Sequence, residues 1–566
     1  MNTGRLRVAL AFAQQLGATG LVLNLLASAA LVCSVAGAPT APVVVLWCLT
    51  AVALVLLEWT RRGQVLRGRQ GLGDFVVARL AAAASALVMS SRTGVESVLV
   101  VATSLVVAVV LCEPVLRRLA GRGNPIAANL PGAATTPDPM FGYGFTFLAD
   151  TVAVVALCVT AAAGLSAVVP LVLSVAAALL LVVATGDALR RFVARRRTEH
   201  RLPDVLAAHA PTFALHWQAA AGTAYQVGMW LPYLERLGKP FVVVVRTGVN
   251  LREAAALTQA PVVLRSSPED LDDAIVPSLK TVFYVNNAPR NSHMVRYPEL
   301  THIQLNHGDS DKAPSFNPVF RMFDKDFVAG QAAIDRFAAN GVHVSPDLFT
   351  IVGRPQVEDV EIAKSPIADV ERPTVLYAPT WAGFNVDSAY SSLGVGVELV
   401  RALVARGCDV AFRPHPYARR TPQFRNACAR IIELLDAENT AGRGRHMFGT
   451  EAEQTMSVTD CFNRSDAMVS DVSSVVADFL YSEKPLAMVA VSADVDRFPD
   501  EFPLAKASYV IDAHAGTLRG LDGVLDAMLG ADPMRDERRS LKTYYLGDIP
   551  AEGYAQRFLD EARAYV

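Results

Sequence analysis

Apolar residues come in long runs over the first third of the chain and in short runs, separated by polar segments, over the rest. Six of the early runs are each close to the ~20 residues that an α-helix needs to cross the apolar core of a bilayer. We therefore predict an α-helical membrane domain of about six spans over residues 1–200. The expected spans are 16–37, 41–58, 75–91, 94–112, 147–165 and 167–186.

The loops between pairs of runs are rich in arginine. Residues 1–200 hold 16 Arg, no Lys and 8 acidic residues, a net of +8, whereas the rest holds 36 basic and 46 acidic residues, a net of −10. Because cytoplasmic loops are enriched in Arg and Lys, we expect both termini in the cytoplasm and a multi-pass protein of the inner (cytoplasmic) membrane. The arginines behind this are Arg5, Arg7, Arg61, Arg62, Arg67, Arg69, Arg117, Arg118, Arg122, Arg190, Arg191, Arg195, Arg196 and Arg197. The acidic back half argues against a nucleic-acid partner, which needs a basic surface.

Few charges interrupt the apolar runs. Arg79 and Asp150 are expected near the cytoplasmic ends, where their heads can reach the interface, and Glu96 near the outer end. Since no charge falls at mid-span, the pattern favours an anchor for a catalytic domain. A role in lipid handling or export is the alternative. The first run also resembles a signal peptide, although Pro39 directly after Ala38 argues against cleavage.

From about residue 203, short apolar runs alternate with helix-like segments, which is typical of parallel α/β domains. Two such series, at 201–370 and 371–566, predict two Rossmann-like domains. The expected strands are 212–216, 241–245, 262–264, 281–285, 302–305, 349–352, 374–378, 410–412, 467–469 and 486–489. The expected helices are 222–237, 251–257, 332–340, 393–406, 426–438, 474–482 and 521–529. Because such sheets bind ligands beyond the carboxyl ends of their strands, polar motifs directly after strands are the candidate site.

One such motif is the turn from Ser470 to Asp478, between a predicted strand and a predicted helix. Asp471, Ser473 and Ser474 can cap the helix, because their oxygens accept from its free N–H groups. The same N–H groups and the helix dipole also attract phosphate. An ordinary cap and a phosphate site are therefore both consistent with this turn.

A second motif, Asn306 to Lys312, follows the predicted strand 302–305. His307 suits proton abstraction from an alcohol, and Lys312 supplies positive charge for a phosphate. Asp309 and Asp311 form a D-x-D that could hold a divalent cation, so such a cation is a possible cofactor. A histidine hydrogen-bonded within a turn is the alternative. The seven Cys contain no C-x-x-C pair and indicate neither a disulfide framework nor a zinc site.

Two further motifs also follow strands. Arg413-Pro414-His415-Pro416 presents a guanidinium fork suited to phosphate together with an imidazole, on a turn stiffened by two prolines. Tyr377-Ala378-Pro379-Thr380-Trp381 adds a hydroxyl at Thr380. A structural loop in which Trp381 packs is the alternative interpretation of the second motif.

Together and in this order, the four motifs resemble those of the CDP-glycerol glycerophosphotransferase family, the polymerases and primases of teichoic acid. That family's W-H-G-T-P-L-K, Y-A-P-T-W, R-P-H-P and S-D-Y-S-S with an Asp four residues on correspond here to Asn306–Lys312, Tyr377–Trp381, Arg413–Pro416 and Ser470–Asp478. Val352-Gly353-Arg354-Pro355 resembles the family's G-x-P-R, with Arg and Pro exchanged.

The chain departs from the family pattern at several positions. Asn306 replaces Trp, Asp309-Ser310-Asp311 replaces Thr-Pro-Leu, and Ala382 stands where the family often has Arg. The His-Pro and Ser-Ser pairs are also similar to the CMP-binding motifs of bacterial sialyl- and polysialyltransferases. A cytidine donor is common to both families.

The resemblance implies a GT-B type pair of Rossmann-like domains, with 201–370 on the acceptor side and 371–566 on the nucleotide side. It implies an enzyme that moves glycerol phosphate, or a similar polyol phosphate, from a CDP-linked donor to a lipid-linked or polymer acceptor at the inner membrane surface, such as a teichoic acid. The implied catalytic residues are His307, as the base, and His415. The implied donor- and phosphate-binding residues are Arg413, Ser473, Ser474, Asp471, Lys312, Thr380 and Asp478, with no metal ligand. The alternatives are a CMP-sugar-dependent glycosyltransferase of capsule synthesis and a membrane scaffold that merely binds a nucleotide.

Overall fold

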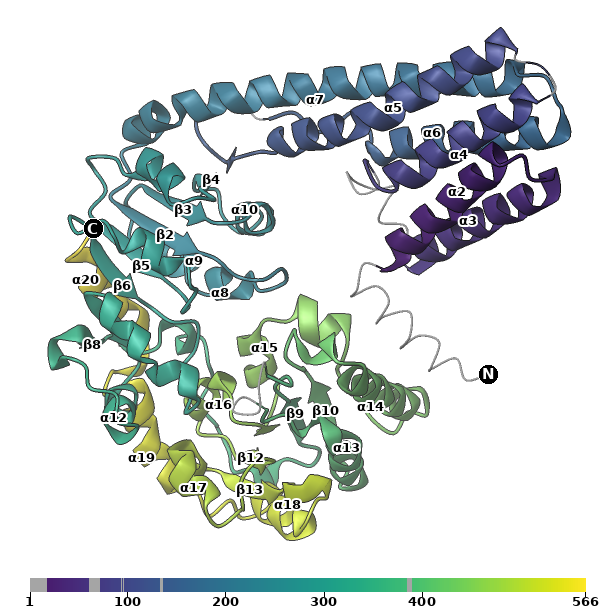
Figure 1. Ribbon diagram of the computed structural model, residues 1–566. Helices are drawn as coiled ribbons and strands as arrows, with labels where there is room; N and C mark the ends of the chain where they lie inside the picture. Colours follow the sequence, from purple (N-terminus) through teal and green to yellow (C-terminus); the bar gives the residue numbers. More distant parts are fainter. Residues whose placement is uncertain (1–17, 61–71, 93, 95, 133–135, 384–388) are drawn as a thin grey trace. The chain divides into compact units, whose positions relative to one another are not determined.

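The computed structural model describes residues 18–60, 72–92, 94, 96–132, 136–383 and 389–566. It divides into two compact units, which are described separately (Figure 1). The first comprises Met1–Ile126 and Gly132–Leu202, and the second Ala127–Pro131 and Pro203–Val566. Arg5, Arg7, Arg61, Arg62, Arg67 and Arg69, on which the predicted topology partly rests, lie outside the described residues.

The first unit is built from helices at the positions of the predicted apolar runs. They are α2 (Ala18–Val35), α3 (Thr40–Thr60), α4 (Val76–Ser91), α5 (Ser97–Arg122), α6 (Gly144–Ala163) and α7 (Val168–His209). Helix α4 presents Ala82, Ala83 and Ala86 to its neighbours, and such small side chains let helices approach closely. By length and composition, α5, α6 and α7 can cross a membrane, whereas the apolar parts of α2, α3 and α4 are shorter. The helical membrane domain is thus supported, and the number of six spans stays a prediction.

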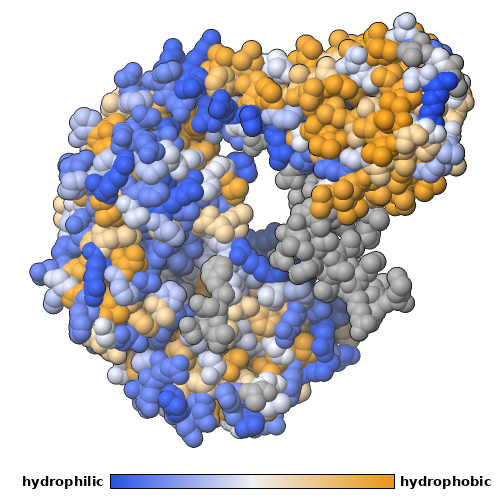
Figure 2. Space-filling model, viewed as in Figure 1, coloured by the Kyte–Doolittle hydropathy of each residue, from blue (hydrophilic) through white to orange (hydrophobic). Residues whose placement is uncertain are grey.

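Much of the surface of this unit is apolar. Figure 2 shows hydrophobic side chains gathered over its helices. Val101 on α5 and Leu179 and Val182 on α7 are 51%, 62% and 67% exposed. Contiguous exposed apolar surface of this kind indicates contact with another apolar phase.

The charges inside these helices differ from the prediction. The side chains of Arg79 and Asp150 are buried, and Arg79 forms ion pairs with Glu113 on α5 (2.5 Å) and with Asp150 on α6 (3.1 Å). The prediction that the charged groups of Arg79 and Asp150 extend to the membrane interface is therefore wrong. Sequence reasoning missed Glu113, because it ended the fourth span at residue 112. The three side chains instead join α4, α5 and α6 through a buried ion cluster.

The second unit contains two sheets. The larger has the order β1-β4-β3-β2-β5-β6-β7-β8 and is parallel except for β1. Its strands are β1 (Ala127–Ala128), β2 (Phe213–Trp217), β3 (Phe241–Val245), β4 (Val262–Leu264), β5 (Thr281–Tyr284), β6 (Thr301–Gln304), β7 (Lys325–Val328) and β8 (Phe349–Ile351). Its helices are α8 (Tyr225–Gly228), α9 (Leu231–Glu235), α10 (Gly248–Ala255), α11 (Asn291–Met294) and α12 (Gln331–Ala339). Without β1, the strand order is that of a Rossmann sheet extended by one strand. The order in which successive strands are added reverses between β2 and β5, which pair in parallel.

The smaller sheet is fully parallel, with the order β10-β9-β11-β12-β13. Its strands are β9 (Thr374–Ala378), β10 (Asp409–Phe412), β11 (Ala467–Ser470), β12 (Leu486–Ala490) and β13 (Tyr509–Asp512). The helices that follow β9 in the chain are α13 (Gly396–Ala405), α14 (Pro422–Thr440), α15 (Val458–Asn463), α16 (Ser474–Leu480), α17 (Phe498–Glu501), α18 (Leu521–Leu529), α19 (Arg535–Leu546) and α20 (Tyr554–Arg563). The order reverses between β9 and β11, so the motifs after these two strands flank its switch point.

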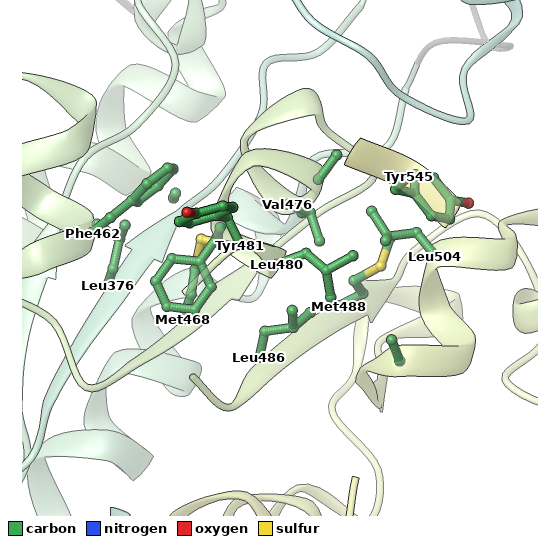
Figure 3. Packing of buried hydrophobic residues seen from close by; sticks show 14 of the residues in the cluster. Leu376, Phe462, Met468, Val476, Leu480, Tyr481, Leu486, Met488, Leu504 and Tyr545 are labelled. Carbon is green, nitrogen blue, oxygen red and sulfur yellow. The ribbon is translucent and has the colours of Figure 1, made fainter. Parts of the chain in front are cut away.

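Packing around β11 and β12 anchors the turn that precedes α16. Val476 and Leu480 of α16 belong to a buried cluster with Met468 of β11 and Met488 of β12 (Figure 3). Tyr545 of α19 belongs to the same cluster. Because apolar contacts fix α16 on one side, the polar turn between β11 and α16 is held at the carboxyl edge of the sheet.

Two segments cross the expected domain boundaries. Residues Ala127–Ala128 lie between α5 and α6 in sequence but pair with β4 as the edge strand β1. Helix α20 returns to the larger sheet, where the Phe558 ring lies 5.1 Å from Trp230 and 6.3 Å from Phe327. The predicted division at residue 200 also falls inside α7. The end of the chain thus completes the first α/β domain, which the division 371–566 does not capture.

Candidate active site

A hydrogen bond to the backbone determines the tautomer of His307, which lies in the turn after β6. Its Nδ1 lies 2.8 Å from the carbonyl oxygen of Val285, so Nδ1 carries the proton and Nε2 is a hydrogen-bond acceptor. Burial lowers the pKa of His307, and the nearby Arg354 lowers it further. The imidazole is thus neutral and able to accept a proton at Nε2.

Gln226 of α8 faces this nitrogen. Its amide Nε2 lies 3.4 Å from His307 Nε2. Its amide oxygen accepts from Asn286 Nδ2 (2.8 Å) and Trp217 Nε1 (3.2 Å), which fixes the direction in which the amide N–H groups point. Sequence reasoning missed Gln226, because it lay inside the expected helix 222–237. That segment instead forms the short helices α8 and α9, separated by a turn.

His415 has the opposite tautomer. The backbone N–H of Tyr417 donates to His415 Nδ1 (3.0 Å), so the proton of the neutral ring lies on Nε2. Burial, with Lys312 and His307 nearby, lowers the pKa of His415 to about 3. His415 can therefore donate a hydrogen bond from Nε2 without carrying a charge.

The ring of Tyr225 lies close to both histidines. Its centroid is 6.2 Å from that of His307 and 6.2 Å from that of His415. Trp381 stacks against His415 at 6.1 Å. An acceptor imidazole from the domain of one sheet and a donor imidazole from the domain of the other thus lie at equal distances from one aromatic ring.

Three of the predicted donor-binding residues lie together. Lys312 Nζ donates to Thr380 Oγ1 (3.2 Å), and Asp471 accepts from the backbone N–H groups of Thr380 (2.7 Å) and Ser392 (3.1 Å). Burial lowers the pKa of Lys312 to about 8, opposed by the charge of Asp471. Burial raises the pKa of Asp471 to about 6. Lys312, which follows β6 of the larger sheet, thus contacts the loop after β9, at the switch point of the smaller sheet.

The His307 turn also contacts the start of α16. A Cβ added at Gly308 would lie 2.5 Å from both Cβ and Oγ of Ser474, so only glycine allows this approach. Ser473 occupies the N-cap position of α16, but its side chain makes no capping hydrogen bond. The ordinary-cap interpretation therefore fails for the Ser473 hydroxyl. Both serines are half-buried, and Ser474 lies beside Gly308.

Two predicted phosphate ligands are engaged elsewhere. Asp478 accepts from Arg354 Nε (2.8 Å) and Nη2 (3.2 Å), which ties α16 to the loop after β8. Arg413 Nη1 donates to the carbonyl oxygens of Met456 (2.9 Å) and Ala452. These contacts give Asp478 and part of the Arg413 guanidinium a structural role, and phosphate binding by either stays a prediction.

The D-x-D carboxylates are also occupied. Asp309 and Asp311 both pair with Arg336 of α12, and Asp311 also accepts from Tyr545 Oη (3.0 Å) and from the backbone N–H of Leu504 (3.1 Å). Over the described part of the chain, no group of three or more His, Cys, Asp or Glu could hold a metal ion. A structural lock between the two sheets explains this motif better than a cation site.

Asn306 adopts a left-handed conformation (φ 58°) that asparagine tolerates better than most residues. Its Nδ2 donates to the buried Asp326 (3.0 Å), and its carbonyl accepts from Trp230 Nε1 (2.5 Å). These contacts give Asn306 a local role at a position where the resembled family has tryptophan.

Comparison with known proteins places this geometry in context. The model of the family described as CDP-Glycerol:Poly(glycerophosphate) glycerophosphotransferase matches residues 357–503. The match confirms the resemblance and the expectation of a CDP-glycerol glycerophosphotransferase-like enzyme. The matched stretch includes Thr380, His415 and Asp471, whereas His307 and Lys312 precede it.

Several solved structures are similar to this chain. The wall teichoic acid polymerase TagF is 12% identical, with 66% of this chain and 94% of that chain covered and a TM-score of 0.40. A putative UDP-N-acetylglucosamine 2-epimerase from Listeria monocytogenes is 11% identical, with 62% and 96% covered and a TM-score of 0.42. No curated protein sequence matches the chain.

Proposed function

We propose that this protein is a membrane-anchored transferase of the GT-B type that moves glycerol phosphate, or a similar polyol phosphate, from a CDP-linked donor to a lipid-linked or polymer acceptor. The observation that carries the proposal is the pair of opposite tautomers at His307 and His415. Transfer of a phosphoryl group to an alcohol needs a base for the alcohol and a donor of hydrogen bonds for the leaving phosphate. The two imidazoles meet these two needs.

In this mechanism, His307 Nε2 removes the proton of the acceptor hydroxyl. The alcohol oxygen attacks the phosphorus that carries the glycerol and forms a new phosphodiester bond. The phosphoanhydride bond of the donor breaks, and CMP leaves with the electron pair. Lys312 and the Nε2–H of His415 stabilise the negative charge of the leaving phosphate. No step is assigned to a cation.

The membrane assignment rests on the apolar surface of the first unit and on the arginine-rich loops. Together they support a multi-pass anchor in the inner membrane with the α/β domains in the cytoplasm. The acceptor would then be a cell-wall or capsule precursor, such as a teichoic acid, at the inner membrane surface. This location would bring a soluble nucleotide donor and a membrane-bound acceptor to the same site.

The test is to supply the purified full chain in lipid vesicles with CDP-glycerol or with CMP-sugars and to measure CMP release and labelled product. We expect release and transfer from CDP-glycerol only, and loss of both activities in a His307→Gln variant. Transfer from a CMP-sugar would instead favour a glycosyltransferase. Nucleotide binding without turnover of any donor would favour a scaffold.

A further inference from the structure

Arg246 directly follows β3 at the carboxyl edge of the larger sheet and is a buried cation. Its side chain is 1% exposed. Its Nη2 donates to His293 Nδ1 (3.1 Å) and weakly to the carbonyl oxygen of Ser266 (3.5 Å), while Nε and Nη1 have no hydrogen-bond partner among the described residues. Because a buried charge is costly unless it is paired, this guanidinium is suited to an anionic ligand.

The surroundings of Arg246 are basic. Arg290 Nη1 donates to the carbonyl oxygens of Arg246 (3.1 Å) and Ser266 (3.4 Å), and the described residues offer neither arginine a carboxylate within ion-pair distance. Arg290 and His293 are only half-buried and lie at the surface beside Arg246. The pKa of His293 is lowered by burial and by these arginines, so the ring is neutral and can donate from Nε2.

Two neighbouring arginines do have carboxylate partners, unlike Arg246 and Arg290. Arg265 pairs with Asp273 (3.2 Å), and Arg296 pairs with Asp272 (2.9 Å). Asp270 of the same loop accepts from the backbone N–H groups of Ser266 (3.1 Å) and Ser267 (2.9 Å). The acids of this loop thus have partners of their own. Asp270 acts on Arg246 only at a distance, and among the described residues neither Arg246 nor Arg290 has a carboxylate within ion-pair distance.

From these contacts, we infer that Arg246, Arg290 and His293 form an anion subsite that binds a phosphate group of the acceptor. The inference rests on the proposed function for the identity of the ligand. An arginine pair suits phosphate because each guanidinium offers several N–H donors in a fixed plane. The phosphate can come from a polyol-phosphate chain or from a lipid pyrophosphate, which present the same chemistry.

The position along the sheet edge fits an extended acceptor. Three strand spacings separate β3 from β6, whose end carries His307, in the order β3-β2-β5-β6. At about 4.8 Å per spacing, the subsite lies roughly 14 Å along the edge from the base. An acceptor whose hydroxyl reaches His307 would thus place a phosphate from farther along its chain at Arg246. The subsite would select acceptors that already carry phosphate over free polyols.

The experiment compares Arg246→Gln and Arg290→Gln with the matched control Arg296→Gln, whose arginine has a carboxylate partner. Full-length protein in neutral-lipid vesicles receives CDP-glycerol with a short soluble poly(glycerol phosphate), a lipid pyrophosphate, or glycerol. We expect KM for a phosphate-bearing acceptor to rise roughly 10- to 100-fold in the first two variants. The donor KM, transfer to glycerol and the control should be unchanged. The acceptor whose KM rises identifies the source of the phosphate.

A second measurement separates this inference from the proposed function. With CMP saturating the donor site, calorimetry measures binding of the poly(glycerol phosphate) and of the lipid pyrophosphate to the same variants. Loss of binding in Arg290→Gln, which is half-buried and least apt to disturb folding, supports the subsite even if no donor is turned over. Binding and KM equal to those of Arg296→Gln would overturn it.

Discussion

At the scale of single residues, the site depends on which ring nitrogen of each histidine carries the proton. His307 is set as a proton acceptor by a carbonyl, and His415 as a donor by a backbone N–H. Neither assignment requires a carboxylate. The low pKa values of both rings, caused mainly by burial, keep them neutral over the physiological pH range.

The pH dependence of turnover should follow Lys312. Its pKa of about 8 means that it is charged below pH 8 and neutral above. Because His307 has a pKa below its usual range and Asp471 has one of about 6, kcat/KM for the donor should stay level from about pH 6 and fall as pH rises through about 8. In Lys312→Arg, whose charge persists, the alkaline fall should disappear. A pH–rate profile that is the same in both proteins would exclude Lys312 as the controlling group.

The candidate residues could be placed at strand ends from the sequence, but their supporting contacts could not. Short apolar runs marked the strands, so the placement of Lys312, Thr380 and Asp471 after their strands followed directly. The partners of His307 could not be predicted, because Val285 acts through its backbone and Gln226 comes from a segment with a misjudged helix pattern. Likewise, nothing local in the sequence links Arg354 to Asp478, which is 124 residues away.

At the scale of elements, the turn after β6 and the start of α16 are in close contact. Gly308→Ala would put a methyl group 2.5 Å from Ser474, so the His307 turn and α16 must separate. We expect turnover to fall at least 10-fold, with lower thermal stability. Gly523→Ala in α18 is the control, since its added methyl group meets nothing within 4 Å. Wild-type activity in Gly308→Ala would show that this contact is not needed.

The buried ion cluster should determine how firmly α4, α5 and α6 associate. Glu113→Ala leaves Arg79 with one carboxylate partner, Asp150, among the described residues and removes the acceptor of the Gly73 N–H (2.9 Å). Losing one partner of a buried pair typically costs about 3–5 kcal/mol. Thermal unfolding in detergent should show a marked loss relative to Glu96→Gln, which alters an exposed carboxylate at the start of α5. Equal unfolding temperatures would mean that the cluster does not stabilise the unit.

At the scale of the whole molecule, the α/β domain of the larger sheet is not continuous in sequence. The edge strand β1 of the larger sheet comes from the connection between α5 and α6. Helix α20, at the end of the chain, packs against the same sheet. Neither was predicted from the sequence, because a two-residue strand has no pattern and α20 resembles any amphipathic surface helix. Strand β7, in which Lys325 and Asp326 interrupt the apolar run, and strand β13 were not predicted either.

A truncated chain of residues 203–566 tests this organisation. It retains His307, Lys312 and Asp471, so we expect it to bind CMP. It lacks β1 and the hydrogen bond from Asn129 Nδ2 to Thr258 O (2.7 Å), which leaves β4 as an open edge. Sedimentation should therefore show self-association that the full-length protein in detergent does not show. Calorimetry that detects no CMP binding to the folded fragment would contradict the location of the donor site.

The most direct test of the account is the single-turnover rate of His307→Gln, measured with CDP-glycerol and acceptor beside the Kd for the donor. If His307 acts as the base, its contribution arises in the transition state. The rate should therefore fall by about 10²–10⁴-fold, while the donor Kd remains nearly unchanged. A variant that loses donor binding but transfers at the wild-type rate once saturated would show that His307 binds the donor, and would contradict the mechanism.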